Sequence, residues 1–237
     1  MTTKQNITIR RSEERGHANH GWLDSYHSFS FARYYDPAHM GFRSLRVINQ
    51  DVVAPGGGFP THPHDNMEIF SYVLRGALSH EDSMGNRKTL HPGEIQLMSA
   101  GSGITHSEFN HSSSDPVELL QIWLTPTERN LTPSYTEWKP NEEQTNASKT
   151  LLISPDGREH SATIHQDALI YRVQLKAGES VPHELTEGRG AWLQLIKGEL
   201  KFNDTLLHPG DAASTEDPGT IQLSAISDAE ALLFDLN

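Results

Sequence analysis

The segment EIFSYVLRGAL, residues 68–78, decides how this chain is expected to fold. It is an apolar, strand-like run that ends at a glycine turn, and its second part, residues 72–78, is echoed by QLIKGEL at residues 194–200. In the same order, HPGEIQL at residues 91–97 is echoed by HPGDAAS at residues 208–214, a Pro-Gly-acid turn that leads into the next strand. This recurrence indicates an internal duplication and predicts two domains of one type.

Further strand-like runs, SLRVINQDVV, EIQLMSA and VELLQIWLT, are separated by clusters of Gly, Pro, Asn and Asp. Short strands with regular turn signals are typical of an all-β sandwich or barrel, so we expect two β-barrels. A polar, proline-bearing segment at residues 125–150 interrupts the pattern and is interpreted as the connection between them. The predicted boundaries are 1–135 for the first barrel, 136–148 for the linker and 149–237 for the second barrel.

Composition excludes several classes of function. The chain has 237 residues with 35% hydrophobic content, which suits a soluble globular protein, and a formal net charge of -12, which disfavours binding to nucleic acid or anionic membranes. The absence of cysteine excludes a disulfide framework, a thiolate zinc site and a cysteine nucleophile. The N-terminus lacks the apolar core of a signal peptide and no apolar run is long enough to span a bilayer, so a cytoplasmic location is expected.

Two segments carry chemistry-bearing residues at a spacing of two. In GGGFPTHPHDNMEIF these residues are His62 and His64, and in SAGSGITHSEFN they are His106 and Glu108. Residues two apart on an extended strand share one face, so neighbouring strands would bring three imidazoles and one carboxylate together. Such a donor set suits Fe, Cu, Ni, Mn or Zn, and the lack of thiolates disfavours a purely structural zinc site. The sequence therefore predicts a first-row metal site in the first barrel.

The second half lacks this pattern, because the matching segment GESVPHEL keeps only His183. We therefore expect the second barrel to be degenerate and to hold no metal. The remaining histidines are scattered through turns and polar stretches and are assigned no metal role: His17, His20, His27, His39, His80, His91, His111, His160, His165 and His208. The aromatic residues Trp22, Phe29, Phe31 and Tyr34 are interpreted as core, and Phe59 is expected to line the mouth of a pocket.

The segments GGGFPTHPHDNMEIFSYVLRG and HPGEIQLMSAGSGITHSEFN resemble the two cupin motifs, and the first half of the chain closely resembles the pirin family. Residues 21–49 are also similar to the pirin amino-terminal signature, and the likeness is dense up to about residue 125. The resemblance implies a bicupin with a metal-binding first barrel and a degenerate second one. It implies that the metal ligands are His62, His64, His106 and Glu108.

Bacterial members of this family are similar to quercetin 2,3-dioxygenases, whereas eukaryotic pirin is described as an iron-dependent transcriptional co-regulator. We therefore expect a quercetinase-type dioxygenase that opens the heterocycle of a flavonol with O2 and releases CO. One divalent metal is expected, with Fe(II) favoured over Cu, Ni, Mn, Co or Zn, and Glu108 serves as base and ligand. The alternative is a non-catalytic, redox-sensing regulator that binds a protein partner. Acireductone or sugar-isomer chemistry ranks third.

Glu68 is the alternative carboxylate ligand, because the general cupin motif uses a glutamate at this place and its even spacing from His64 would keep it on the same face. Glu108 is favoured, since a second ligating carboxylate would add negative charge to a complete four-ligand set. Glu68 is then expected to act as a hydrogen-bond partner behind the ligands. Gly101 departs from the general cupin motif, which often has proline at this position.

Overall fold

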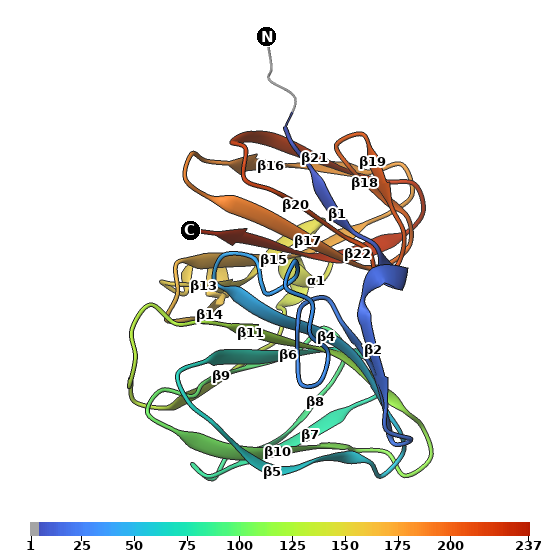
Figure 1. The fold of residues 1–237 in the computed structure, drawn as a ribbon. Helices are drawn as coiled ribbons and strands as arrows, with labels where there is room; N and C mark the ends of the chain where they lie inside the picture. Colours follow the sequence, from blue (N-terminus) through green and yellow to red (C-terminus); the bar gives the residue numbers. More distant parts are fainter. Residues whose placement is uncertain (1–4) are drawn as a thin grey trace. The chain divides into compact units, whose positions relative to one another are not determined.

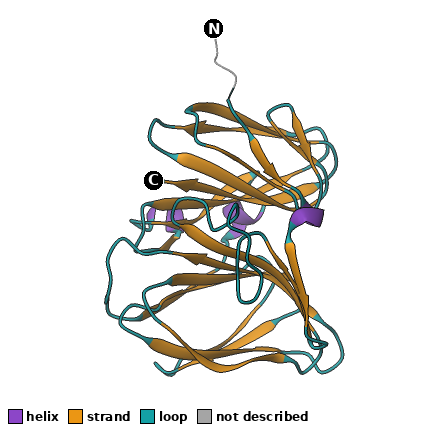
Figure 2. Ribbon diagram, in the orientation of Figure 1, coloured by secondary structure: helices purple, strands orange, loops and turns teal. Residues whose placement is uncertain are grey.

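The computed structural model describes residues 5–237, and residues 1–4 of the predicted first barrel lie outside this range. The chain divides into two compact units, one of residues 16–140 and 162–166, the other of residues 5–15, 141–161 and 167–237. Both are almost entirely β-strand, as Figures 1 and 2 show. Within the described residues, no helix has the length and apolar character needed to cross a bilayer.

The first barrel consists of two antiparallel sheets. One has the strand order β12-β9-β6-β11-β4-β3-β2 and the other the order β5-β10-β7-β8. The strands of this unit are β2 (Gly16–Asn19), β3 (Leu23–His27), β4 (Leu45–Val53), β5 (Gly58–His64), β6 (Glu68–Arg75), β7 (Leu78–Asp82), β8 (Arg87–Leu90), β9 (Ile95–Ser99), β10 (Ile104–Asn110), β11 (Val117–Leu124), β12 (Ser134–Trp138) and β14 (Ala162–Thr163).

The second barrel repeats this arrangement, with one sheet containing β1-β20-β17-β22-β15-β13 in that order and the other β16-β21-β18-β19. Its elements are β1 (Thr8–Arg10), β13 (Lys149–Ser154), β15 (Ala168–Leu175), β16 (Ser180–Leu185), β17 (Gly190–Lys197), β18 (Leu200–Phe202), β19 (Thr205–Leu207), β20 (Ala212–Thr215), β21 (Gly219–Ala225) and β22 (Ala229–Leu236), with the short helices η1 (Ser12–Glu14), α1 (Glu142–Thr145) and η2 (Arg158–His160). The matching strand order confirms the duplication and the bicupin fold.

Two segments belong to other units than a simple division of the chain at residues 136–148 would give. β1 pairs with β20, where Ile9 lies opposite Ala213, so residues 5–15 belong to the second unit. β12 lies inside the segment interpreted as a linker, yet it pairs with β9 and extends a sheet of the first barrel. β1 covers β20 and β12 covers β9, which are equivalent strands of the two barrels. The backbone N–H and C=O groups along these strands are thereby paired rather than exposed at a sheet edge.

A polar row crosses the interior of the first barrel. Directly paired positions on five neighbouring strands carry His27, Asn49, Gln121, Ser71 and Gln96, all of them buried. Apolar clusters lie on both sides of this polar row. On β6, Val73 belongs to the first cluster and Ile69 to the second, and Ser71 lies between them on the same face. The first cluster is Leu23, Val53, Val73, Leu78, Leu90, Val117 and Leu119, and the second is Ile69, Met98, Ala100 and Ile104.

The second barrel has an apolar row where the first has the polar one. Leu193 occupies the place of Ser71, because each lies five residues before the glycine that ends its strand. Leu193 pairs with Ala213 on one side and with Leu233 on the other, and all three side chains belong to one fully apolar cluster. The two barrels therefore share a backbone design, but at this level the polar row of the first barrel is replaced by apolar residues in the second.

Candidate metal centre

Two strands bring three histidines together. β5 and β10 are antiparallel neighbours in which His106 lies directly opposite His62, and alternation along β5 places His64 beside them. The Nε2 atom of His106 lies 3.0 Å from Nε2 of His64 and 3.1 Å from Nε2 of His62. The structure thus brings together three of the four residues that the sequence singled out.

The environment of His64 and His106 favours the neutral, electron-donating form of both imidazoles. Burial and the neighbouring histidines lower the pKa of His64 to about 4 and that of His106 to about 3. His62 Nδ1 donates to the carbonyl oxygen of Pro60 at 2.8 Å, which leaves Nε2 as the nitrogen that faces His106. His64 and His106 therefore present neutral imidazoles with an Nε2 lone pair at neutral pH.

These features fit a bound divalent transition metal. The Nε2 atoms of His62 and His64 each lie about 3 Å from Nε2 of His106, which suits donors to one ion at metal–nitrogen distances of about 2.1 Å. Without an ion, the Nε2 atoms of three imidazoles would face one another in close contact. His62 and His64 are half-buried while His106 is buried, so the cluster has one side open to a ligand. The donor chemistry is that of a first-row metal site.

Glu108 lies next to this cluster rather than inside it. It is within 4.8 Å of His106 and His80, but the group formed by His62, His64 and His106 does not include it. Neutral donors hold the buried carboxylate: Ser71 Oγ and Gln96 Nε2 each donate to Oε1 at 3.0 Å, and Gln121 Nε2 donates to Oε2 at 3.2 Å. The polar row therefore orients Glu108 beside the histidines.

His80 is a buried neighbour of the site to which the sequence assigned no role. It lies opposite Glu108 in the pairing of β7 with β10, and Gln96 Nε2 lies 3.0 Å from its Nδ1 atom. Its Nε2 atom is 3.3 Å from Asp82 Oδ2. A sequence signal was available, because Leu78, His80 and Asp82 alternate along one strand and therefore share the interior face.

The structure places Glu68 away from the cluster. The residues between His64 and Glu68 form a turn from β5 to β6, so their even spacing does not keep them on one face. The side chain of Glu68 is buried and accepts a hydrogen bond from Ser99 Oγ at 2.6 Å and one from the backbone of His165 at 3.3 Å. Ser71, on the opposite face of β6, makes the contact with Glu108 instead.

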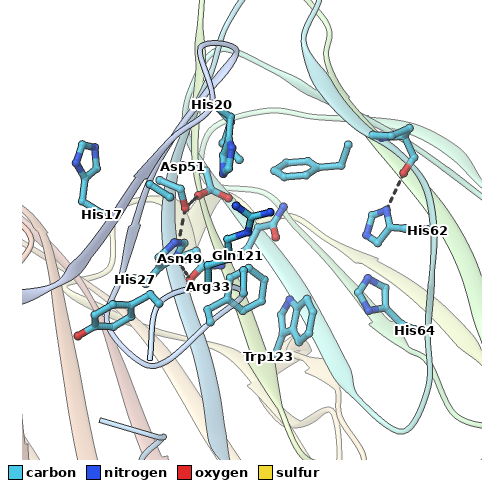
Figure 3. Close-up of a pocket in the computed structure, with 18 of the residues that line it drawn as sticks. His17, His20, His27, Arg33, Asn49, Asp51, His62, His64, Gln121 and Trp123 are labelled. Atoms are coloured by element: carbon cyan, nitrogen blue, oxygen red, sulfur yellow. Dashed lines mark hydrogen bonds between the residues drawn. The ribbon is translucent and has the colours of Figure 1, made fainter. Parts of the chain in front are cut away.

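A cavity of about 690 Å³ opens beside the histidines, as Figure 3 shows. Phe59 lines it, together with Leu23, Phe31, Tyr34 and Trp123. The edge of His64 packs against Trp123 with ring centroids 4.8 Å apart. Of the aromatic residues interpreted as core, Phe29 is buried, whereas Phe31 and Tyr34 form part of the cavity wall. Cavities of this size hold drug-sized ligands.

Two cupin barrels in one chain, of which the first has converging imidazoles, define a bicupin whose amino-terminal domain carries a histidine cluster able to hold a metal. The family model for pirin matches residues 8–124, and the model for the quercetinase C-terminal cupin domain matches residues 151–236. The chain belongs to the pirin family. It is 48% identical over 97% of its length to a quercetin 2,3-dioxygenase of Escherichia coli K12, of which it covers 98%. A pirin-like protein of Caulobacter vibrioides is 38% identical, with 94% of this chain and 96% of the relative covered.

Solved structures agree with this assignment. The crystal structure of YhhW from Escherichia coli matches with a TM-score of 0.94 and 48% identity, and the alignment covers 98% of each chain. The same bacterial pirin in complex with nickel(II) matches with a TM-score of 0.93 and 47% identity over 98% of this chain and 99% of that one. The nickel complex shows that a close relative of this chain binds a first-row divalent metal.

Proposed function

We propose that the protein is a metal-dependent dioxygenase of the quercetinase type, which opens the heterocycle of a flavonol with O2 and releases CO. The observation that carries the proposal is the convergence of His62, His64 and His106 on one point at the side of a 690 Å³ cavity. The similarity to a protein named quercetin 2,3-dioxygenase supports the choice of substrate class. The apolar walls of the cavity suit a planar aromatic ligand.

The metal ligands we propose are His62, His64, His106 and Glu108, the carboxylate that lies next to the three imidazoles. Fe(II) is the ion we propose, since imidazole and carboxylate donors suit it and the relative's nickel complex places another first-row ion in this family. When bound, such an ion acts as a Lewis acid that lowers the pKa of the substrate hydroxyl, and it assists the reaction with O2.

The side chains of the barrel would position the substrate and handle its proton. Glu108 is the proposed base for the flavonol 3-hydroxyl, because it is the carboxylate beside His106 and three neutral donors fix its orientation. Trp123 and Phe31 offer flat apolar surfaces against which the fused rings would pack. The apolar side chains of the cavity wall would limit the access of water to the reacting ring.

Two variants test the role of Glu108. Glu108→Gln keeps an oxygen donor but loses the proton acceptor, so metal should be partly retained while oxygen uptake with quercetin falls by roughly 100-fold or more. Glu68→Gln is the matched control, since Glu68 is an equally buried glutamate that contacts Ser99 rather than the histidine cluster. It should keep its metal and most of its activity. If Glu68→Gln is inactive and Glu108→Gln is nearly normal, the assignment of the carboxylate is wrong.

A further inference from the structure

Asp51 is a buried carboxyl group on the cavity wall away from the histidines. In Figure 3 it lies with Asn49 and His27 on one side of the cavity, whereas His62 and His64 lie on the other. It belongs to β4, and its side chain faces the barrel interior with an exposure of only 1%. Nothing in the proposed chemistry at the histidine cluster uses this residue.

The hydrogen bonding of Asp51 is incomplete. Ser25, directly opposite on β3, donates a short hydrogen bond from Oγ to Asp51 Oδ1. Among residues 5–237 this is the one side-chain hydrogen bond of Asp51, and no Lys, Arg or His forms an ion pair with it. A carboxylate can accept about four hydrogen bonds, and burial with so few is costly. Burial accordingly raises the pKa of Asp51 to about 7.

The neighbours of Asp51 form a polar strip on the cavity wall. His27 Nδ1 lies 2.8 Å from Asn49 Oδ1 and 3.4 Å from Ser25 Oγ, so these groups are already engaged with one another. The surrounding cavity wall includes Leu23 and Phe31. A ligand that reaches from the histidines to this strip would pass apolar side chains such as these, which suit a ring system, and a hydrogen-bond donor at its far end would meet Asp51.

We propose that Asp51 is a specificity-determining residue that accepts a hydrogen bond from a phenolic hydroxyl on a ring of the substrate remote from the reacting 3-hydroxyl. The site would then select polyhydroxylated flavonols over unsubstituted ones. This inference rests on the proposed function, because it assumes that the reacting end of a flavonol lies at the histidines. A phenolic O–H would supply the donor that Asp51 lacks within the protein.

The test compares quercetin with 3-hydroxyflavone, which keeps the 3-hydroxyl and 4-carbonyl but has no other phenolic group. Dissociation constants are measured by fluorescence quenching with the metal-loaded protein under anaerobic conditions. At pH 8, where the Asp51 carboxyl is mostly ionised, Asp51→Leu should weaken quercetin binding by roughly 10- to 100-fold, the value of a hydrogen bond to a charged group, and change 3-hydroxyflavone binding by less than about twofold. Asp51→Asn, which is nearly isosteric, should weaken quercetin binding in the same direction by a smaller factor.

The matched control is Gln50→Leu, a polar-to-leucine change on the same strand but on the opposite face. It should leave both dissociation constants unchanged. An equal loss for the two ligands in both Asp51 variants, or no loss for quercetin, would overturn the inference. Oxygen uptake measured on the same samples separates the two proposals. Selective binding through Asp51 without turnover contradicts the proposed function alone, and turnover without this selectivity contradicts the role of Asp51 alone.

Discussion

Replacement of Asp51 by Asn should change the stability of the protein in a strongly pH-dependent way. The carboxyl is fully buried and has a pKa of about 7 in the folded state, compared with 3.8 for the ordinary group. The folded protein therefore holds this proton more tightly than the unfolded chain. Between pH 3.8 and about pH 7 the unfolded chain loses this proton while the folded protein retains it. The free energy of unfolding therefore falls as the pH rises through this range. Asparagine has no proton to lose and avoids this penalty.

The size of the effect follows from the two pKa values. At about 1.4 kcal/mol for each tenfold change in proton affinity, the gap between 3.8 and about 7 corresponds to about 4 kcal/mol once the group is fully ionised. Part of this loss is already present at pH 5, because the unfolded chain is ionised there. The difference in unfolding free energy between Asp51→Asn and the parent protein should therefore grow by roughly 2 to 3 kcal/mol from pH 5 to pH 8.

The assay is urea denaturation of both metal-loaded proteins at several pH values, followed by tryptophan fluorescence. Taking the difference between the two proteins cancels the pH dependence that they share, including that of metal binding. Ser25→Ala provides a second check, because the hydrogen bond from Ser25 lowers the pKa of Asp51 and its removal should raise that pKa further. A difference that stays constant within about 0.5 kcal/mol from pH 5 to pH 8 would refute the account of Asp51.

Three other substitutions have defined outcomes. His106→Ala should lower metal affinity by on the order of 100-fold or more, measured by competition with a chelator, because its Nε2 atom lies near those of both other histidines. His183→Ala should leave metal content unchanged but lower the free energy of unfolding by about 1–3 kcal/mol, since it removes a buried contact of 2.9 Å with Asp235; loss of metal would show that the second barrel is not degenerate. Gly101→Ala should cost about 2–3 kcal/mol in denaturation experiments, because φ is +48° and the added Cβ would lie 2.1 Å from the carbonyl oxygen of Leu131; unchanged stability would contradict this reading.

The sequence was sufficient to predict those features that depend on strand alternation and on repeated turns. The echo of residues 72–78 at residues 194–200 predicts the duplication, and the spacing of two in both histidine motifs predicts the shared face of His62, His64 and His106. Gly101 is also explained locally, because its positive φ is incompatible with the proline that the general motif often has.

The remaining features depend on strand register and on turns, which alternation within one segment does not determine. His80 joins the site because β7 pairs with β10 in a particular register, and Asp51 meets Ser25 for the same reason across β3 and β4. Glu68 is separated from His64 by a turn, so their even spacing in the sequence does not place them on one face of a strand. The pairing of β1 with β20 joins residues about 200 positions apart, which no local pattern could indicate.

The most direct test of the central claim is a single-turnover experiment with the parent protein. Protein loaded anaerobically with Fe(II) is mixed with quercetin and then with ¹⁸O-labelled O2, and both the CO released and the label in the ring-opened product are measured. The account predicts about one CO for each O2 consumed, with both oxygen atoms of O2 in the product. A protein that holds its metal at the histidines and binds quercetin, yet consumes no O2 and releases no CO, would contradict it.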